Sequence, residues 1–446
     1  MFITHENLSF NGGLVSLIFI AHSHLNYSPL VTHVIMSRLV KIPPSLCIRC
    51  RGTKMLCGLT YCPIEVGKMA KTLITDFKGT ELVGDSPPAI FVGRYGYPSV
   101  RVYPSAPPVR GDTTSYEKPG EWLNMKMENF LSMRLSLIRG GMTIKAGNAS
   151  DPDRTLQDLQ VMSLSETPAE TYIEFQKPIN SSSFELDDNT TPMGPWSPVK
   201  RMKIEPGKPN MAAEKAYYDT DLKANGAILD MYNKNVDVQA ISKVLSMGVV
   251  GEKTNRKLVP TRWSITAVDK NVSDSLVSRV KYLPQIDEFQ VFRRSTDGNL
   301  FTAILCPTSW RFEWGEAWFP GSTWNAFGNI AQVEIDSEGY GGRTTYPGIG
   351  GCYYASRLAV TEKFTGMGRS GSAILWREIY PNFNLPIGVW YVRENLREMF
   401  RTAPAKFDNF QEALKYLNPH FKVDVKKWIE KSPSYALMKS NLYSFG

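Results

Sequence analysis

Residues 47–62 read Cys-Ile-Arg-Cys-Arg-Gly-Thr-Lys-Met-Leu-Cys-Gly-Leu-Thr-Tyr-Cys and contain four of the six cysteines of a chain of 446 residues. The spacing is C-x2-C, then six residues, then C-x4-C. Four thiolates this close together are typical of a structural zinc ion with tetrahedral ligands. The sequence therefore predicts a small four-cysteine metal-binding module with a following helix in residues 36–80, with ligands Cys47, Cys50, Cys57 and Cys62.

Two alternatives to zinc remain open. The Cys62-Pro63 pair resembles the end of ligand runs that hold cubane iron–sulfur clusters. We favour zinc because C-x2-C knuckles are the commoner use of this spacing. Two disulfides or four free thiols would also fit the residues, but nothing else in the chain indicates an oxidising compartment.

The first 35 residues differ in composition from the rest of the chain. They contain one charged residue, Glu6, and four of the five histidines. The apolar stretch from Gly13 to Ala21 is too short to span a bilayer. We expect Met36 to be the true start, and residues 1–35 to be a non-native or disordered extension. His420 is then the only histidine, so the sequence offers no candidate residues for a Ser-His-Asp triad or an H-E-x-x-H zinc site.

The remaining composition indicates a globular protein with an acidic partner. The apolar fraction is 42% and the net charge is +8, which favours nucleic acid without requiring it. Cys306 and Cys352 are flanked by apolar residues and are most simply buried thiols of a reducing cytoplasm.

Strand and helix patterns alternate irregularly along the chain, which predicts an α+β (mixed α/β) fold. After the cysteine module we expect a first α+β part over 81–177, a linker or arm over 178–212, a main α+β domain over 213–431 and a flexible tail over 432–446. The segment 178–209 is polar and rich in Pro, Ser and Asn, which is typical of a linker.

Several elements are predicted within these parts. Residues 89–103 form two strands around a Gly/Pro turn, and residues 296–299 form the turn of a second hairpin. Residues 122–138 form a helix that Gly140 and Gly141 end. Residues 262–269 and 389–391 form strands, and Asp408 caps a helix that extends to Leu417.

Cationic and aromatic residues interleave after the first of these strands. The run Arg94-Tyr95-Gly96-Tyr97-Pro98 continues with Arg101. Arginine can bind phosphates while tyrosine stacks on bases, as in proteins that grip single-stranded or distorted nucleic acid. The alternative is an ordinary hairpin with an amphipathic face.

A glycine-rich run, Pro347 to Gly351, precedes a predicted helix and could bind a phosphate with help from Arg343 and Arg357. A plain tight turn is the simpler interpretation, because no Walker loop or dinucleotide fingerprint is present. Four acids at predicted element ends could bind Mg²⁺ as in a nuclease if they converge, although each is more simply a cap or a surface acid. They are Asp219, Asp221, Asp269 and Glu338.

The C-terminal tail carries an aliphatic and an aromatic residue three positions apart, Leu442 and Phe445. One helical turn would place both side chains together for insertion into an apolar pocket, with Lys439 before them. A frayed terminus that folds back on the core is the alternative.

Taken together, these residues resemble the archaeal Nre family of DNA repair proteins from Met36 to the end. The resemblance implies a role in DNA repair, a cysteine metal site and a C-terminal PIP motif that binds the sliding clamp PCNA. The usual motif has Gln where this chain has Lys439, and a second aromatic residue where it has Gly446. The resemblance rests on the cysteine block and on residues 220–224, 258–269, 339–343, 353–354 and 388–394.

We therefore expect a cytoplasmic, membrane-free DNA repair protein that binds zinc, DNA and PCNA. The alternative is an enzyme that acts on DNA or nucleotides, either a carboxylate/Mg²⁺-dependent nuclease or an enzyme that uses a nucleotide cofactor.

Overall fold

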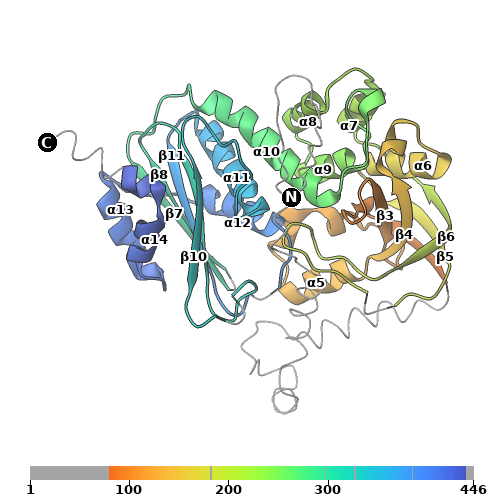
Figure 1. Cartoon of the computed structure of the whole chain (residues 1–446), viewed down its shortest axis with the longest axis horizontal. Coiled ribbons are helices and arrows are strands. Elements are labelled where there is room, and N and C mark those ends of the chain that lie inside the picture. Colours follow the sequence, from red (N-terminus) through yellow and green to blue (C-terminus); the bar gives the residue numbers. More distant parts are fainter. Residues whose placement is uncertain (1–79, 181–182, 297, 326–327, 384, 438–446) are drawn as a thin grey trace, which may run out of the picture. The chain divides into compact units, whose positions relative to one another are not determined.

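The computed structural model describes residues 80–180, 183–296, 298–325, 328–383 and 385–437. The cysteine block, the helix after it and the residues Lys439, Leu442 and Phe445 lie outside these ranges, so the metal module and the tail motif stay predictions. The chain divides into an N-terminal unit, residues 80–275 with 385–394, and a C-terminal unit, residues 276–383 with 395–437. Each unit combines one six-stranded sheet with helices (Figure 1), which confirms the mixed α+β class.

The sheet of the N-terminal unit has the strand order β1-β5-β6-β4-β3-β2. All neighbouring strands are antiparallel except β4 and β6, which run parallel. The predicted first hairpin is confirmed as β2 and β3. The strands are β1 (Glu81–Ser86), β2 (Ala89–Val92), β3 (Ser99–Ala106), β4 (Ile138–Lys145), β5 (Ala169–Phe175) and β6 (Trp196–Glu205).

One face of this sheet packs against helices, and its other face is open along part of β3 and β4. Val100 and Val102 are buried, whereas Arg101 between them is exposed, as strand alternation requires. Helices α6 and α9 contact the sheet (Figure 1). The helices of this unit are α4 (Pro119–Trp122), α5 (Met127–Leu135), α6 (Arg154–Ser163), α7 (Met211–Tyr218), α8 (Ala224–Asn233), α9 (Val238–Ser246) and most of α10 (Thr261–Val280).

The helix expected over residues 122–138 is confirmed only in part, and Gly140 and Gly141 do not end it. Two shorter helices, α4 and α5, occupy part of this range, and both glycines lie inside strand β4. A Cβ atom on Gly140 would lie 2.6 Å from Val199 Cγ2, and one on Gly141 would lie 2.8 Å from Trp196 Cε3. The glycines are therefore required by close packing of β6 side chains on the β4 backbone, and they do not end a helix.

The segment expected as a linker or arm contributes strand β6 to the middle of the sheet. β6 pairs with β4 only as far as Pro198, and from Val199 onward it pairs with β5. The missing N–H of Pro198 thus falls at the point where the β4–β6 ladder ends, which is a position that tolerates proline.

The sheet of the C-terminal unit has the strand order β10-β9-β11-β8-β7-β12. Every residue of β8 and β11, at its centre, is buried. Helices α13 and α14 cover one face and α11 covers the other (Figure 1), so both faces exclude water. The strands are β7 (Phe289–Thr296), β8 (Asn299–Cys306), β9 (Phe312–Trp318), β10 (Gln332–Glu338), β11 (Ser372–Ile379) and β12 (Ala405–Phe407).

The helices that belong to this unit begin with α11 (Gly351–Met367), which follows the glycine-rich run as predicted. The others are α13 (Phe410–Leu417), α14 (Val425–Lys431) and most of α12 (Trp390–Arg401). The second predicted hairpin is confirmed as β7 and β8. The cap of α13 is Asn409, whose side chain accepts from the N–H of Glu412, and not Asp408 as expected.

The strands expected over residues 262–269 and 389–391 are wrong, because both segments lie in helices, α10 and α12. The buried residues Ile265, Val268 and Val272 recur at intervals of three and four. The same spacing relates Val392, Leu396 and Met399, which are buried residues of α12. β-branched and aromatic residues suggested strands, but the helical period of the buried positions decides the structure.

The expectation of a loose tail from Ser432 onward is wrong for residues 432–437, which are helical from Pro433. The buried carboxylate of Glu313 on β9 accepts hydrogen bonds from Ser432 Oγ (2.8 Å), the Ser434 N–H (3.0 Å) and Trp376 Nε1 (3.0 Å). Ser432 and Ser434 are themselves buried. Residues 432–434 are thus fixed to the sheet, because the two side-chain oxygens of Glu313 accept from several donors at once.

Candidate nucleic-acid interface

The turn of the β2–β3 hairpin presents one of the predicted cation–aromatic pairs to solvent. The Arg94 guanidinium lies 5.1 Å from the ring centroid of Tyr95, which is 68% exposed. Tyr97 instead packs against Trp263 of α10, with 5.2 Å between ring centroids. Tyr97 therefore attaches the hairpin to a helix, while Tyr95 is exposed and Arg94 is half-buried.

Arg101 belongs to a row of alternating cations and rings, which we call the cation–aromatic ladder. The Arg139 guanidinium lies 5.0 Å from the Tyr103 ring, Tyr103 meets Trp196 edge-on at 5.6 Å, and Arg101 lies 5.0 Å from the Trp196 ring. Arg139 is buried and donates from Nε to the carbonyl of Gly194 (2.6 Å). Arg101, at the other end, is exposed, so the ladder fixes its guanidinium at the surface.

Two neighbours share this face of the sheet with Arg101. The β3–β4 register places Thr143 opposite Arg101, and Lys145 opposite Ser99. Because directly opposite residues project from the same face of a sheet, Thr143 and Lys145 accompany Arg101 on its open side. Both are exposed.

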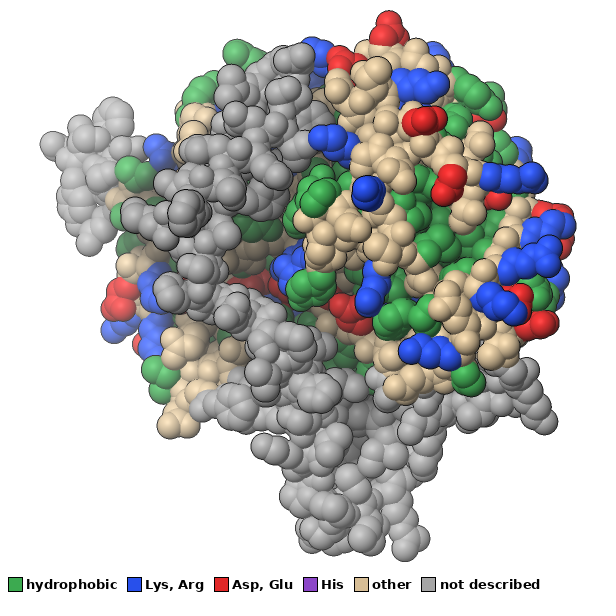
Figure 2. All heavy atoms as spheres, turned by 45° about the vertical axis from the view of Figure 1, so that its right-hand side comes forward, with side chains coloured by type: hydrophobic (Ala, Val, Ile, Leu, Met, Phe, Trp, Pro, Cys, Tyr) green, Lys and Arg blue, Asp and Glu red, His purple; other side chains and the backbone are tan. Residues whose placement is uncertain are grey.

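The N-terminal unit contains both paired and unpaired cations. Within the described residues, Arg94, Arg101 and Lys145 have no acidic partner. Three cations on or beside β1, β5 and β6 are paired with acids, whereas no acidic partner of the exposed Arg201 is seen among the described residues, and Figure 2 shows Lys and Arg interspersed with Asp and Glu on the right of that view. The pairs are Lys200–Glu174 (2.6 Å), Lys203–Glu205 (2.6 Å) and Arg110–Asp85 (2.9 Å).

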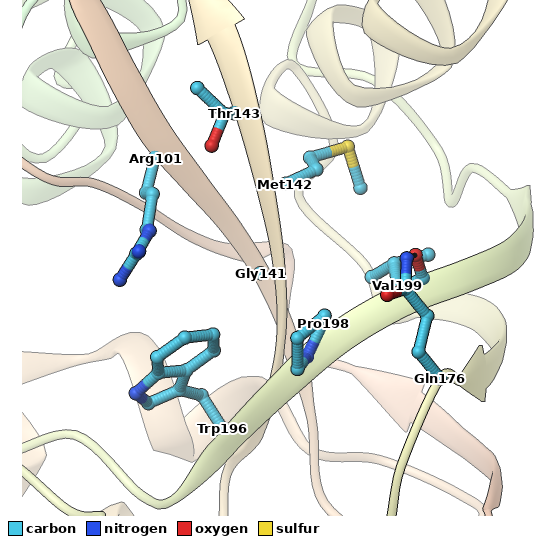
Figure 3. Close-up of a pocket in the computed structure, with 8 residues that line it drawn as sticks. All are labelled: Arg101, Gly141, Met142, Thr143, Gln176, Trp196, Pro198 and Val199. Carbon is cyan, nitrogen blue, oxygen red and sulfur yellow. Dashed lines mark hydrogen bonds between the residues drawn. The ribbon is translucent and has the colours of Figure 1, made fainter.

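A depression opens beside the ladder, where β4 and β6 separate. The two strands pair only from Arg139–Trp196 to Gly141–Pro198, after which β4 continues with β3 and β6 with β5. We call this opening the sheet fork. Its volume is about 320 Å³. Figure 3 shows the residues that line it. It is lined by Arg101, Gly141, Met142, Thr143, Gln176, Trp196, Pro198 and Val199.

Arg357, one of the predicted phosphate ligands, is committed elsewhere. It is buried and donates from Nε to Glu338 (2.9 Å). Glu338 also accepts from Trp310 Nε1 (3.1 Å) and from the Tyr353 hydroxyl (3.1 Å), and burial next to this carboxylate raises the pKa of Tyr353. This buried network joins α11 to the sheet and leaves Arg357 inaccessible.

Arg343, the second predicted phosphate ligand of the C-terminal unit, pairs with Asp336 (2.9 Å). The other oxygen of Asp336 accepts from the N–H of Ile349 (2.9 Å). One carboxylate thus fastens both the arginine and the glycine-rich run, which supports the tight-turn interpretation over a phosphate site. Of the six predicted nucleic-acid residues, the structure groups Arg94 with Tyr95 and gives Arg101 a separate aromatic support.

Each acid considered for a nuclease site has hydrogen-bond or ion-pair partners of its own, wherever the structure shows its contacts. Arg393 Nη1 lies 2.8 Å from both carboxylate oxygens of the buried Asp269. Asp219 accepts from the N–H of Leu222 (3.0 Å), as a turn cap does. In the part of the chain that the structure describes, no three His, Cys, Asp or Glu side chains are placed to hold a metal ion.

Four residues of this surface were not predicted from the sequence, namely Trp196, Thr143, Lys145 and Gln176. Trp196 lies in the proline-rich segment that was interpreted as a linker, and its contact with Arg101 joins residues 95 positions apart. If residues 138–145 had been predicted as a strand, the alternation of side chains would have placed Thr143 and Lys145 on the same face.

These features define a mixed α+β protein whose N-terminal sheet carries two exposed cations, Arg101 and Lys145, on an open face, with the Arg101 guanidinium beside the Trp196 ring. Helices long and apolar enough to cross a membrane are absent from the described residues. The chain belongs to the archaeal Nre family: the family models "Archaeal Nre, N-terminal" and "Archaeal Nre, C-terminal" match residues 56–325 and 338–445. This confirms the resemblance found in the sequence.

Named relatives cover most of the chain. It is 44% identical over 387 residues to DNA repair protein NreB of Archaeoglobus fulgidus, an alignment that spans 86% of this chain and 96% of the relative. It is 33% identical over 384 residues to DNA repair protein NreA of the same organism (86% and 95%). It is 32% identical over 377 residues to DNA repair protein NreA of Haloferax volcanii (82% and 90%). No solved structure matches the chain significantly.

Proposed function

We propose that this protein is a DNA repair factor that binds DNA on the open face of its N-terminal sheet. The names of its relatives support the repair role. The DNA contact is supported by three cations without acidic partners among the described residues, which are the exposed Arg101 and Lys145 of this face and the half-buried Arg94 of the β2–β3 turn. The exposed ring of Tyr95 adds a surface on which a base can stack.

The observation that carries this proposal is the support of Arg101 by Trp196. A guanidinium stacked on a ring keeps its N–H donors in the guanidinium plane, where they can reach a phosphate. Holding the side chain in place also reduces the rotamer entropy that phosphate binding would otherwise cost. Because phosphate contacts supply much of the affinity of proteins for DNA, a fixed and unpaired arginine is an effective anchor.

The first prediction concerns the salt dependence of DNA binding. Replacing Arg94 and Arg101 together by Gln should reduce the slope of log affinity against log salt by about 1 to 2, because each lost phosphate contact removes about 0.7–0.9. Fluorescence anisotropy of a labelled oligonucleotide at several salt concentrations measures this slope.

The matched control for that experiment is the double variant Lys200→Gln, Lys203→Gln. It removes the same charge from β6, where both lysines are paired with glutamates. We expect its slope to equal that of the wild-type protein. An arginine double variant that behaves like this control would contradict the proposed interface.

We also propose that Cys47, Cys50, Cys57 and Cys62 bind one structural zinc ion, with an iron–sulfur cluster as the alternative. The spacing of the thiols supports this, since four thiolates held close together need a cation. Thiols that bind a metal must stay reduced, and the cytoplasm is a reducing compartment. We therefore propose that the protein is cytoplasmic.

The second prediction follows from this metal site. Protein purified without added metal should contain about one zinc per chain by elemental analysis. Replacing Cys50 and Cys57 by Ser should remove it, whereas replacing Cys306 and Cys352 by Ala, as a matched control, should not. Less than stoichiometric zinc and iron, with all four thiols titrating freely, would refute the site.

We further propose that Lys439, Leu442 and Phe445 form a PIP-like motif that binds the sliding clamp PCNA. Leu442 and Phe445 supply apolar area worth about 1.5–3 kcal/mol each when fully buried. Lys439 lacks the acceptor that a Gln amide offers, so the polar part of the contact is weaker. Glu313 fixes residues 432–434 to the C-terminal sheet, so the segment that leads to the motif starts from a defined position.

The third prediction is a clamp affinity on the order of micromolar, as expected for a short motif with few anchors. Phe445→Ala should abolish binding, because it removes one of two apolar anchors, and Lys439→Gln should strengthen it. Calorimetric titration with PCNA measures both effects.

Tyr443→Ala is the matched control, since it removes an aromatic ring outside the two anchor positions and should leave binding unchanged. A chain that ends at Leu437 should also lose binding while it retains the Ser432 and Ser434 contacts with Glu313. Equal affinities for wild type, Phe445→Ala and this shortened chain would contradict the motif.

A further inference from the structure

The sheet fork is built as a pocket by the way β4 and β6 separate. Beyond Gly141 and Pro198 the two strands no longer pair, because each continues with a different neighbour. Gln176, just after β5, donates from its backbone N–H to the carbonyl of Pro198 (2.9 Å) and from Nε2 to the carbonyl of Val199 (2.9 Å). These bonds hold β6 toward β5 and keep the fork open on the β4 side.

The lining of the fork combines apolar walls with polar groups at its mouth. Met142, Pro198 and Val199 supply apolar surface, and the Trp196 ring lies against the backbone of Gly141. Thr143 and Arg101 lie on the β3–β4 side, and Gln176 lies on the opposite side (Figure 3). None of the described residues that line the fork is acidic, so an anionic ligand meets no repulsion from its walls.

We infer that the sheet fork binds one unpaired nucleotide of DNA. A flat base has faces that fit between apolar walls and an edge that can bond Thr143 and Gln176. The phosphate of the same nucleotide then lies near Arg101 and Lys145, which share the open face of the sheet. The inference rests on the proposed DNA binding and specifies which part of the DNA this face recognises.

A base paired inside a duplex cannot enter the fork. Its faces are covered by its neighbours and its edge by its partner, so only an extruded or unpaired base is available. The volume of the fork, about 320 Å³, lies at the lower end of the range of small-ligand pockets. This volume suits a single base rather than a longer segment of DNA. The open face therefore distinguishes interrupted DNA from intact duplex.

The fourth prediction tests this preference with the full-length protein. The probes are two duplexes of equal length, one fully paired and one with a single extra 2-aminopurine nucleotide. Wild-type protein should bind the bulged duplex about fivefold or more tightly than the paired one, because one base gains stacking contacts. Burial of 2-aminopurine against Trp196 should also quench its fluorescence.

Thr143→Val removes one hydroxyl from the mouth of the fork and leaves the charge unchanged. It should lower affinity for the bulged duplex about two- to tenfold, the range of one lost hydrogen bond, and should affect the paired duplex less. Thr155→Val, on an exposed position of α6, is the matched control and should change neither.

Equal binding of both duplexes by wild-type protein would overturn the inference and leave the DNA interface intact. Equal effects of Thr143→Val and Thr155→Val would overturn it as well. No binding to either duplex would instead overturn the proposed function itself.

Discussion

The close approach of the Trp196 indole to the backbone of Gly141 is the contact on which the N-terminal sheet and its open face depend. Any Cβ at position 141 would meet the ring at 2.8 Å, so a glycine is needed there. With the ring in place, β6 lies beside β4, Tyr103 meets the ring edge, and Arg101 stacks above it. The absence of a side chain at Gly141 therefore allows β6 to join the sheet. The Trp196 ring that occupies this space holds Arg101 at the surface and forms one wall of the fork.

The C-terminal unit uses a different device, which is a set of buried glutamates on its central strands. Glu378 on β11 accepts from the N–H groups of Lys422 and Val423 (2.9 and 2.7 Å), and Glu313 on β9 accepts from residues 432 and 434. Burial raises the pKa of both carboxyls, yet each is surrounded by donors that compensate in part. These carboxylates attach the C-terminal segment to the sheet at two points, the second of them directly before the proposed clamp motif.

The sequence was sufficient where a signal is local. Turn residues and alternation predicted both hairpins, and the interleaving of Arg94, Tyr95 and Arg101 located part of the open face. It failed where long-range packing decides the outcome, as in the glycines of β4, which are explained by β6 side chains more than 50 residues away. Arg343 and Arg357 show the same limit, because composition cannot reveal that Asp336 and Glu338 already pair with them.

The central claim is that DNA lies on the open face of the N-terminal sheet, and ultraviolet crosslinking to DNA that carries 5-iododeoxyuridine tests it most directly. Mass spectrometry of the crosslinked peptides should identify Tyr95 and Trp196, the rings beside the unpaired cations. The C-terminal unit offers a built-in comparison in Tyr340 and Tyr346, which are 50% and 48% exposed. Crosslinks at Tyr340 and Tyr346, with none at Tyr95 or Trp196, would contradict the claim.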